Sequence, residues 1–417
     1  MKVPKKQTWL ILVMAGVFYL YEYVLRVSPQ VLMHHLMGKY SLDSTSFGFM
    51  SAFYYIAYVP LQTPCGYILD RLGVRFVITA STLLCTSGAI IFTYTDQLII
   101  AYIGRFLMGM GSACAYVSCM KVGADWFESK MFPLIAGITL MMGQLGAAVG
   151  THPFSFLVFL LGYFKAMNVL ILLGGIIAFL AYKIIPSKPM VERPKPLNIL
   201  DSFKVVLRSK INWVLGLYGL FMYVGISGFA ELWAIPFFMQ KINASCYSVA
   251  TLPIFFFIGV GVGSPIISNI AKKINLPHLT MAMLGLLGAL LFYIIVYVNI
   301  GFIVSSALLF FMGALCGGHV LCFVIAKENT PLELSGTTLG FLNMIVMTSG
   351  LIFQPLIGFL LDQNWTGLYD SKGIKSYSLQ NFEYAMFVIL LTYVASFLLI
   401  SFYFRKEIKQ ELMNKIL

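Results

Sequence analysis

Long apolar segments follow one another along almost the whole chain, separated by short polar turns. A helix needs about 20 apolar residues to cross the ~30 Å hydrocarbon core of a bilayer, and each segment reaches that length. The segments are continuously apolar, whereas the strands of a membrane barrel alternate apolar and polar residues. We therefore predict twelve membrane-spanning helices, over residues 8–37, 44–66, 74–94, 98–123, 132–154, 157–184, 211–239, 247–270, 279–298, 301–325, 336–361 and 382–404.

The longest polar stretch is rich in proline and lysine and separates six predicted helices from the other six. Such a composition suits a linker rather than a membrane span. The sequence thus predicts an all-α membrane protein built of two six-helix bundles. We expect an N-terminal bundle over 1–184, a linker over 185–210, a C-terminal bundle over 211–404 and a tail over 405–417.

The composition excludes a soluble protein. Hydrophobic residues make up 59% of the chain and charged residues only 11%, against roughly 25% charged residues in soluble domains. The net charge of +12 could suit nucleic acid, but the basic residues stand at helix ends, so no nucleic-acid partner is expected. The seven cysteines show no metal-binding spacing, and neither a metal nor a cofactor is expected.

The basic residues also predict the orientation in the membrane. If the N-terminus is cytoplasmic, 21 of the 28 lysines and arginines lie on the cytoplasmic side, five lie outside and two lie within helices. Cytoplasmic loops carry the excess of positive charge in membrane proteins. Both termini, the linker and the tail are therefore predicted to be cytoplasmic.

Pairs of glycines four residues apart predict close packing of helices. Such a pair places both glycines on one helix face, so that two backbones can approach each other in lipid. Four pairs fit this pattern: Gly146 and Gly150, Gly259 and Gly263, Gly313 and Gly317, and Gly336 and Gly340.

A charged hairpin joins the second and third predicted helices, with the sequence Gly66-Tyr-Ile-Leu-Asp70-Arg71-Leu-Gly73-Val-Arg75. Its glycines permit the chain to reverse, and an ordinary charged turn would account for that much. The spacing, however, resembles the loop signature of the major facilitator superfamily. Arg105-x3-Gly109-x-Gly111 in the fourth helix resembles a second motif of that family. The resemblance implies a transporter rather than an enzyme, in which Gly66, Asp70, Arg71, Gly73 and Arg75 form a latch between the two halves.

Charged residues inside the predicted helices are the main functional signal, because each costs roughly 2.5–3.5 kcal/mol at the centre of a membrane helix. Glu22 and Arg26 are four residues apart and can pair on one face. Arg105 is predicted to lie at a similar depth. Arg26 or Arg105 would then hold a substrate carboxylate, which a guanidinium can bind through two parallel hydrogen bonds. Glu22, beside Tyr19 and Tyr23, would hold a proton or an ammonium group. Alternatively, these charges only fasten two helices together.

The second half of the chain offers further candidates for the substrate or proton site. Glu231 and Trp233 lie in the seventh predicted helix, where nearby glycines and Pro236 permit a bend. Glu231 could instead stand at the outer water boundary. His319 is a candidate proton carrier or a satisfied polar group, and Asn343 is a candidate hydrogen-bond donor.

Tyr21-Glu22-Tyr23-x2-Arg26-x2-Pro29, together with Ala230-Glu231-Leu-Trp233-x2-Pro236, is similar to the phagosomal nutrient transporters of intracellular bacterial pathogens. This resemblance implies a monomer in the bacterial inner membrane that imports an amino acid or similar carboxylated nutrient. No Gly-x4-Gly-Lys-Ser/Thr loop occurs, so a proton gradient is the expected driving force. A siderophore, polycarboxylate or nucleoside carrier and a proton-driven exporter remain alternatives, although the Gly-Pro pair typical of exporters is missing from the fifth helix. The sequence leaves open the protonation state of Glu22.

Overall fold

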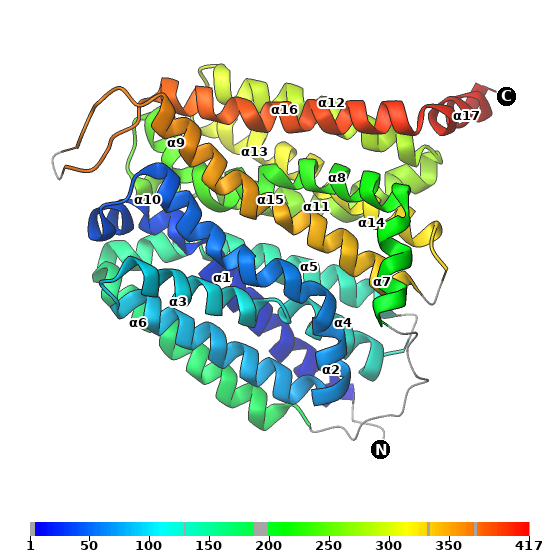
Figure 1. Cartoon of the computed structure of the whole chain (residues 1–417), viewed down its shortest axis with the longest axis horizontal. Coiled ribbons are helices and arrows are strands. Elements are labelled where there is room, and N and C mark those ends of the chain that lie inside the picture. Colours follow the sequence, from blue (N-terminus) through cyan, green and yellow to red (C-terminus); the bar gives the residue numbers. More distant parts are fainter. Residues whose placement is uncertain (1–4, 129–130, 187–198, 332–333, 371–372, 417) are drawn as a thin grey trace.

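The computed structural model describes residues 5–128, 131–186, 199–331, 334–370 and 373–416. Predictions that concern residues 1–4, 187–198 or 417 lie outside this part of the chain. Almost all the described residues are helical, and the long helices run side by side (Figure 1). Ten helical segments are long and apolar enough to cross a membrane. The predicted class, an all-α membrane protein, is confirmed.

The described α-helices of the first half of the chain fill the lower part of Figure 1. They are α1 (Lys5–Tyr40), α2 (Ser44–Tyr94), α3 (Leu98–Ser112), α4 (Ala115–Trp126), α5 (Phe132–Val149) and α6 (His152–Ile184).

The helices of the second half fill the upper part of Figure 1. They are α7 (Ile199–Arg208), α8 (Lys210–Val224), η2 (Gly225–Trp233), α9 (Ala234–Ile242), α10 (Cys246–Val249), α11 (Leu252–Ile274), α12 (Pro277–Tyr297), α13 (Phe302–Gly317), η3 (Gly318–Val320), α14 (Leu321–Glu328), α15 (Ser335–Gln363), α16 (Leu379–Tyr403) and α17 (Arg405–Ile416). Helix α7 falls within the predicted linker and is not one of the ten candidate spans.

Two of the ten candidate spans are 51 residues long, about 76 Å if straight, which is more than twice the thickness of a membrane core. Each contains a glycine with a positive φ of 77°, Gly73 in α2 and Gly162 in α6, where the chain leaves the helical conformation. Both spans could be divided at these glycines, but the predicted number of twelve membrane-spanning helices stays a prediction. The break predicted between residues 154 and 157 is wrong, because the polar Thr151 and His152 occupy a local break between α5 and α6 and the reversal follows only at Gly162.

The start of α1 and the last helix, α17, lie at the same end of the bundle, on the right of Figure 1. We call this the terminal end. The opposite end, which carries the loop between α15 and α16, is called the distal end.

Glycines bring several helices into backbone contact. A side chain on Gly146 of α5 would collide with the backbone of α1 at Leu20. In the same way, a side chain on Gly259 of α11 would collide with the backbone of Phe310 in α13, and one on Gly313 of α13 with the backbone of Phe256 in α11. Three of the four predicted glycine pairs therefore pack as expected. The pair Gly336 and Gly340 does not, since each faces open space with no atom within 4 Å of an added Cβ.

Helices α2 and α15 join the two halves and meet only over part of their length. At the distal end the backbone of Ser44 packs on Gly358, and Gly48 packs on Gln354. Farther along, the ring of Tyr55 lies against Gly350. Nearer the terminal end, Asn343 donates a hydrogen bond to Gln62. Farther along, a Cβ added at Gly66 of α2 or at Gly340 of α15 would meet no atom within 4 Å. The halves are thus closed against each other at the distal end and separate toward the terminal end.

Candidate functional site

Four charged side chains of the predicted helices are buried in the bundle. Glu22 and Arg26 of α1, Arg105 of α3 and Glu231 of η2 are each exposed by 2% or less. Burial of a charge in a membrane protein is costly unless a partner compensates it. The partners of these four groups therefore indicate what each of them does.

Glu22 and Arg26 form the predicted ion pair. Nη2 of Arg26 donates to both carboxylate oxygens of Glu22, at 3.0 and 3.2 Å. Tyr54 of α2 completes a triangle, since its hydroxyl donates to Oε2 of Glu22 at 2.6 Å and accepts from Nε of Arg26 at 3.2 Å. The pair is therefore fixed in position by a group from a second helix.

Tyrosine rings surround the Arg26 guanidinium. Its central carbon lies 4.1 Å from the ring centroid of Tyr23, 4.7 Å from that of Tyr58 and 5.2 Å from that of Tyr54. Such cation–π contacts stabilise a desolvated cation. Nη1 of Arg26 is buried and has no hydrogen-bond partner among the described residues. One strong donor is thus available in the middle of the protein.

Arg105 has different surroundings. Nη1 donates to the backbone carbonyl of Leu25 at 3.0 Å, and Nη2 donates to those of Ser51 and Arg26 at 3.2 and 3.4 Å. These bonds tie α3 to α1 and α2. The contacts favour the structural alternative for Arg105, because both of its terminal nitrogens are hydrogen-bonded to backbone carbonyls, while Nε has no partner among the described residues.

Glu231 lies in a π-helical segment, η2, in which the wider turn replaces the predicted bend. π-Helical turns are rare and are often found at functional sites. The hydroxyl of Tyr55, on α2 of the opposite half, donates a short hydrogen bond to Oε2 of Glu231. Glu231 is 1% exposed, so the alternative of a carboxylate at the outer water boundary is wrong.

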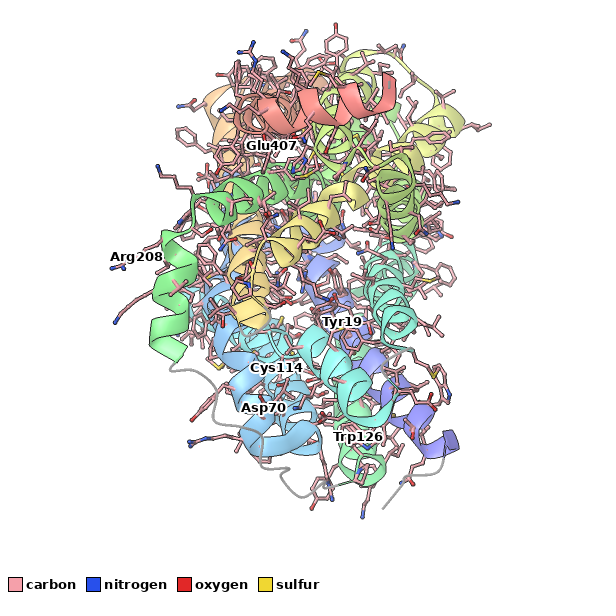
Figure 2. All side chains as sticks on the ribbon, turned by 90° about the vertical axis from the view of Figure 1, so that its right-hand side faces the viewer. Tyr19, Asp70, Cys114, Trp126, Arg208 and Glu407 are labelled. Carbon is pink, nitrogen blue, oxygen red and sulfur yellow. The ribbon has the colours of Figure 1, made fainter. Side chains whose placement is uncertain are left out.

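The remaining predicted residues surround this cluster. Tyr19 packs edge-on against Tyr23, with 5.2 Å between the ring centroids, and in a view from the terminal end it lies near the boundary of the halves (Figure 2). His319 binds the carbonyl of Cys316 through Nδ1 at 2.9 Å. Trp233 donates to the carbonyl of Gln354 at 3.1 Å, which places it among the distal contacts rather than at the ion pair.

Sequence reasoning missed the tyrosines of α2. Tyr54, Tyr55 and Tyr58 bind Glu22, Glu231 and Arg26, and none of the three is among the predicted site residues. One signal was present: Tyr54 and Tyr58 are four residues apart and therefore share a helix face. A tyrosine hydroxyl that is buried in a membrane span usually has a hydrogen-bond partner, so these two residues predict a buried polar group beside them.

The predicted latch lies at the terminal end, where Figure 2 shows Asp70 near Trp126. Asp70 forms a short ion pair with Lys121 of α4, which also lies 3.5 Å from Asp125. The guanidinium carbons of Arg71 and Arg75 lie over tyrosine rings, at 4.9 and 4.0 Å. Gly73 makes the reversal, and Gly66 faces open space. The role of these residues as a latch stays a prediction.

Comparisons with known proteins agree with this architecture. A family model described as Major Facilitator Superfamily matches residues 11–355. A bacterial homolog of the human lysosomal transporter Spinster, solved in an inward-facing and unoccupied conformation, is similar in structure, with a TM-score of 0.78 over 95% of this chain and 97% of that chain. At 14% sequence identity, this similarity concerns the fold alone.

Among curated proteins, the uncharacterized transporter YybO of Bacillus subtilis (strain 168) is 26% identical over 157 residues, which are 38% of this chain and 36% of that protein. The chain thus matches about a third of the length of this relative. The probable galactarate/D-glucarate transporter GudP of Escherichia coli (strain K12) is 22% identical over 390 residues, 84% of this chain and 86% of that protein. Since the family model covers most of its length, this chain belongs to the Major Facilitator Superfamily and is a membrane transporter, not an enzyme.

Proposed function

We propose that the protein is a secondary active transporter that imports a small carboxylated solute together with protons. The observation that carries this proposal is the Arg26 guanidinium, held in place by Glu22 and three tyrosine rings while its Nη1 has no partner among the described residues. A carboxylate is the ligand that suits such a donor, because charge-assisted hydrogen bonds to guanidinium are short and strong.

Two solute classes fit this donor. Amino acids are implied by the resemblance to the phagosomal transporters, and the relative GudP is named for galactarate and D-glucarate, which are hydroxylated dicarboxylates. The tyrosine hydroxyls beside Arg26 could hydrogen-bond the hydroxyl groups of a sugar acid. In either case Arg26 would bind one carboxylate, and the rest of the pocket would select among solutes.

The transport cycle would use both ends of the bundle in turn. Contacts between α2 and α15 close the distal end and are lacking near Gly66 and Gly340. With the termini in the cytoplasm, as the excess of positive charge at that end supports, the conformation described here is open to the cytoplasm. We therefore propose alternating access in the bacterial inner membrane by a monomer, with Glu22, Glu231 or His319 carrying the proton.

Uptake by purified protein in liposomes tests the proposal. With the lumen more alkaline than the outside, radiolabelled D-glucarate and a panel of amino acids are offered in turn. At least one should accumulate, and Arg26→Lys should lose about tenfold or more of the uptake rate, because lysine keeps the charge but not the two-pronged donor. Lys406→Ala, on the exposed face of α17, is the matched control that keeps wild-type uptake.

A thermal-shift screen widens the search to nucleosides and citrate-based chelators, since a ligand that binds the folded state raises the unfolding temperature. Stabilisation by nucleosides alone would contradict the carboxylate proposal. Accumulation that requires the opposite pH gradient would identify an exporter.

A further inference from the structure

Glu231 is a buried carboxyl group with incomplete compensation. Tyr55 donates to one of its oxygens, Oε2, while Oε1 has no hydrogen-bond partner among the described residues. In the same part of the chain, no lysine, arginine or histidine nitrogen lies within ion-pair distance of it. A carboxylate in such surroundings is costly, whereas a neutral carboxylic acid is tolerated far better.

Both nearby cations are hydrogen-bonded to other groups, although Nη1 of Arg26 and Nε of Arg105 have no partner among the described residues. Arg26 and Arg105 are close enough to Glu231 to act on it electrostatically. Arg26, however, is hydrogen-bonded to Glu22 and Tyr54, and Arg105 is bonded to three backbone carbonyls. Two buried carboxyl groups, Glu22 and Glu231, thus lie within electrostatic range of the Arg26 guanidinium, which is hydrogen-bonded to Glu22.

Within the described ranges, no other charged group of the packed helices forms an ion pair with Glu231. Lys241 of α9, Lys272 and Lys273 of α11 and Asp362 of α15 stand in the last turns of their helices, and Cys316 of α13 contacts Tyr393. The ionisable groups close to Glu231 are Glu22, Tyr23, Arg26, Tyr55, Arg105 and Tyr223.

We propose that Glu231 is the proton-carrying group of the transporter, that it is protonated in the conformation closed at the distal end, and that Tyr55 links its protonation to that closure. The hydrogen bond from Tyr55 to Glu231 crosses from α2 of one half to η2 of the other. When the O–H bond of the acid breaks and the proton leaves to water, the new carboxylate attracts the free Nη1 of Arg26. The opening then depends on Arg26 drawing the carboxylate away from Tyr55, because a carboxylate that stayed in place would accept an even stronger hydrogen bond from that hydroxyl. Loss of this hydrogen bond removes a contact between the two halves.

This inference rests on the proposed function only in assuming that transport is coupled to protons. It also assigns Glu22 a different task, since Glu22 holds Arg26 away from Glu231 and is not itself the carrier. Neutralising either carboxyl should therefore have opposite consequences. Glu231→Gln removes the carboxyl group that titrates. Glu22→Gln frees Arg26 to pair with Glu231, so that Glu231 loses its proton more easily.

Infrared difference spectroscopy between acid and alkaline pH, on purified protein without solute, reads the carboxyl group directly. The band of a protonated buried carboxylic acid should be present in the wild type and vanish in Glu231→Gln. In Glu22→Gln it should persist, and the midpoint of its pH titration should lie at lower pH than in the wild type. Thermal unfolding confirms that both variants fold. A band that survives in Glu231→Gln, or that vanishes only in Glu22→Gln, overturns the assignment.

Distances between spin labels at Ile99 and Ile303 test the link to conformation. These exposed residues begin α3 and α13 at the distal end of opposite halves. Alkaline pH should lengthen the distance between the labels in the wild type. In Glu231→Gln the distance should stay short at alkaline pH. Tyr55→Phe should be partly open at every pH, so that alkaline pH has little further effect on its distance. Equal pH responses in the wild type and Glu231→Gln would disprove the link.

Exchange of radiolabelled D-glucarate or an amino acid between the two sides of the liposome separates this inference from the proposed function. Glu231→Gln should keep exchange but lose accumulation against a gradient by about tenfold or more, as expected when only proton coupling is removed. If no solute is exchanged by the wild type, the proposed function fails, while the infrared band and the label distances still decide the proton site.

Discussion

The amide of Asn343 on α15 donates a 2.7 Å hydrogen bond to Oε1 of Gln62 on α2, on the terminal side of the contact between Tyr55 and Gly350. Gln62 in turn donates to the carbonyl of Ala113 at 3.4 Å. One polar bridge thus connects the two halves between the buried ion pair and the open terminal end.

Removal of this bridge should lower stability by about 0.5–1.5 kcal/mol, the usual net value of a hydrogen bond. Asn343→Ala and Gln62→Ala each remove it, so the double variant should be less destabilised than the sum of the two. Thermal unfolding of the four proteins gives the coupling. Additive effects would indicate that the two side chains stabilise the protein independently.

The distal end depends on Asp362. Its carboxylate accepts from the backbone and hydroxyl of Thr45, at 2.7 and 2.6 Å, and from Lys375 at 3.2 Å. Asp362→Ala leaves these donors unpaired and should weaken closure by about 1.5–3 kcal/mol, or roughly ten- to a hundredfold in the equilibrium between conformations. The distance between labels at Ile99 and Ile303 should lengthen. Asp370→Ala, in the exposed loop, is the comparison expected to have a smaller effect.

The hydrogen bond between Tyr377 and Asp362 should make the stability of the protein depend on pH in the alkaline range. Burial, together with the 2.5 Å hydrogen bond that its hydroxyl donates to Asp362, raises the pKa of Tyr377 above its ordinary value. The contribution of the neutral hydroxyl is therefore complete below about pH 10, the ordinary pKa of tyrosine, and declines as the pH rises from there toward the raised pKa of the folded protein. Unfolding temperatures measured above pH 10 should fall more steeply for the wild type than for Tyr377→Phe. Parallel curves would contradict this.

Replacement of two glycines by larger residues should have different effects on the stability of the protein. Gly146→Ala places a methyl group against the backbone of Leu20 and should cost about 1–3 kcal/mol, the usual penalty for overpacking. Gly340→Ala meets no atom within 4 Å and should be neutral or stabilise the helix by up to about 1 kcal/mol. If the terminal end closes at Gly340 during transport, Gly340→Val should slow uptake while the unfolding temperature stays unchanged.

Local sequence patterns were sufficient for part of the site. Glu22 and Arg26 pair because residues four apart share a helix face, and the helix is set by an apolar run of the right length. Likewise, the glycine of the charged hairpin, Gly73, marks a real reversal of the chain. The break predicted between residues 154 and 157 is misplaced, since the helix is interrupted locally at residues 150–151 and the chain leaves the helical conformation again only at Gly162.

By itself, the sequence determined that this protein is a helical membrane protein with charges inside its spans, since hydropathy is a property of about 20 consecutive residues and the spacing of a charged pair that of one helical turn. Apart from the pair of Glu22 and Arg26, the tertiary structure alone decided which partner each buried charge has. Tyr55 and Glu231 are 176 residues apart and meet because two helices from opposite halves cross. The same packing places the Arg105 guanidinium against backbone carbonyls and leaves Gly336 and Gly340 facing open space. Such contacts depend on the tilt and separation of whole helices, which no short stretch of residues specifies.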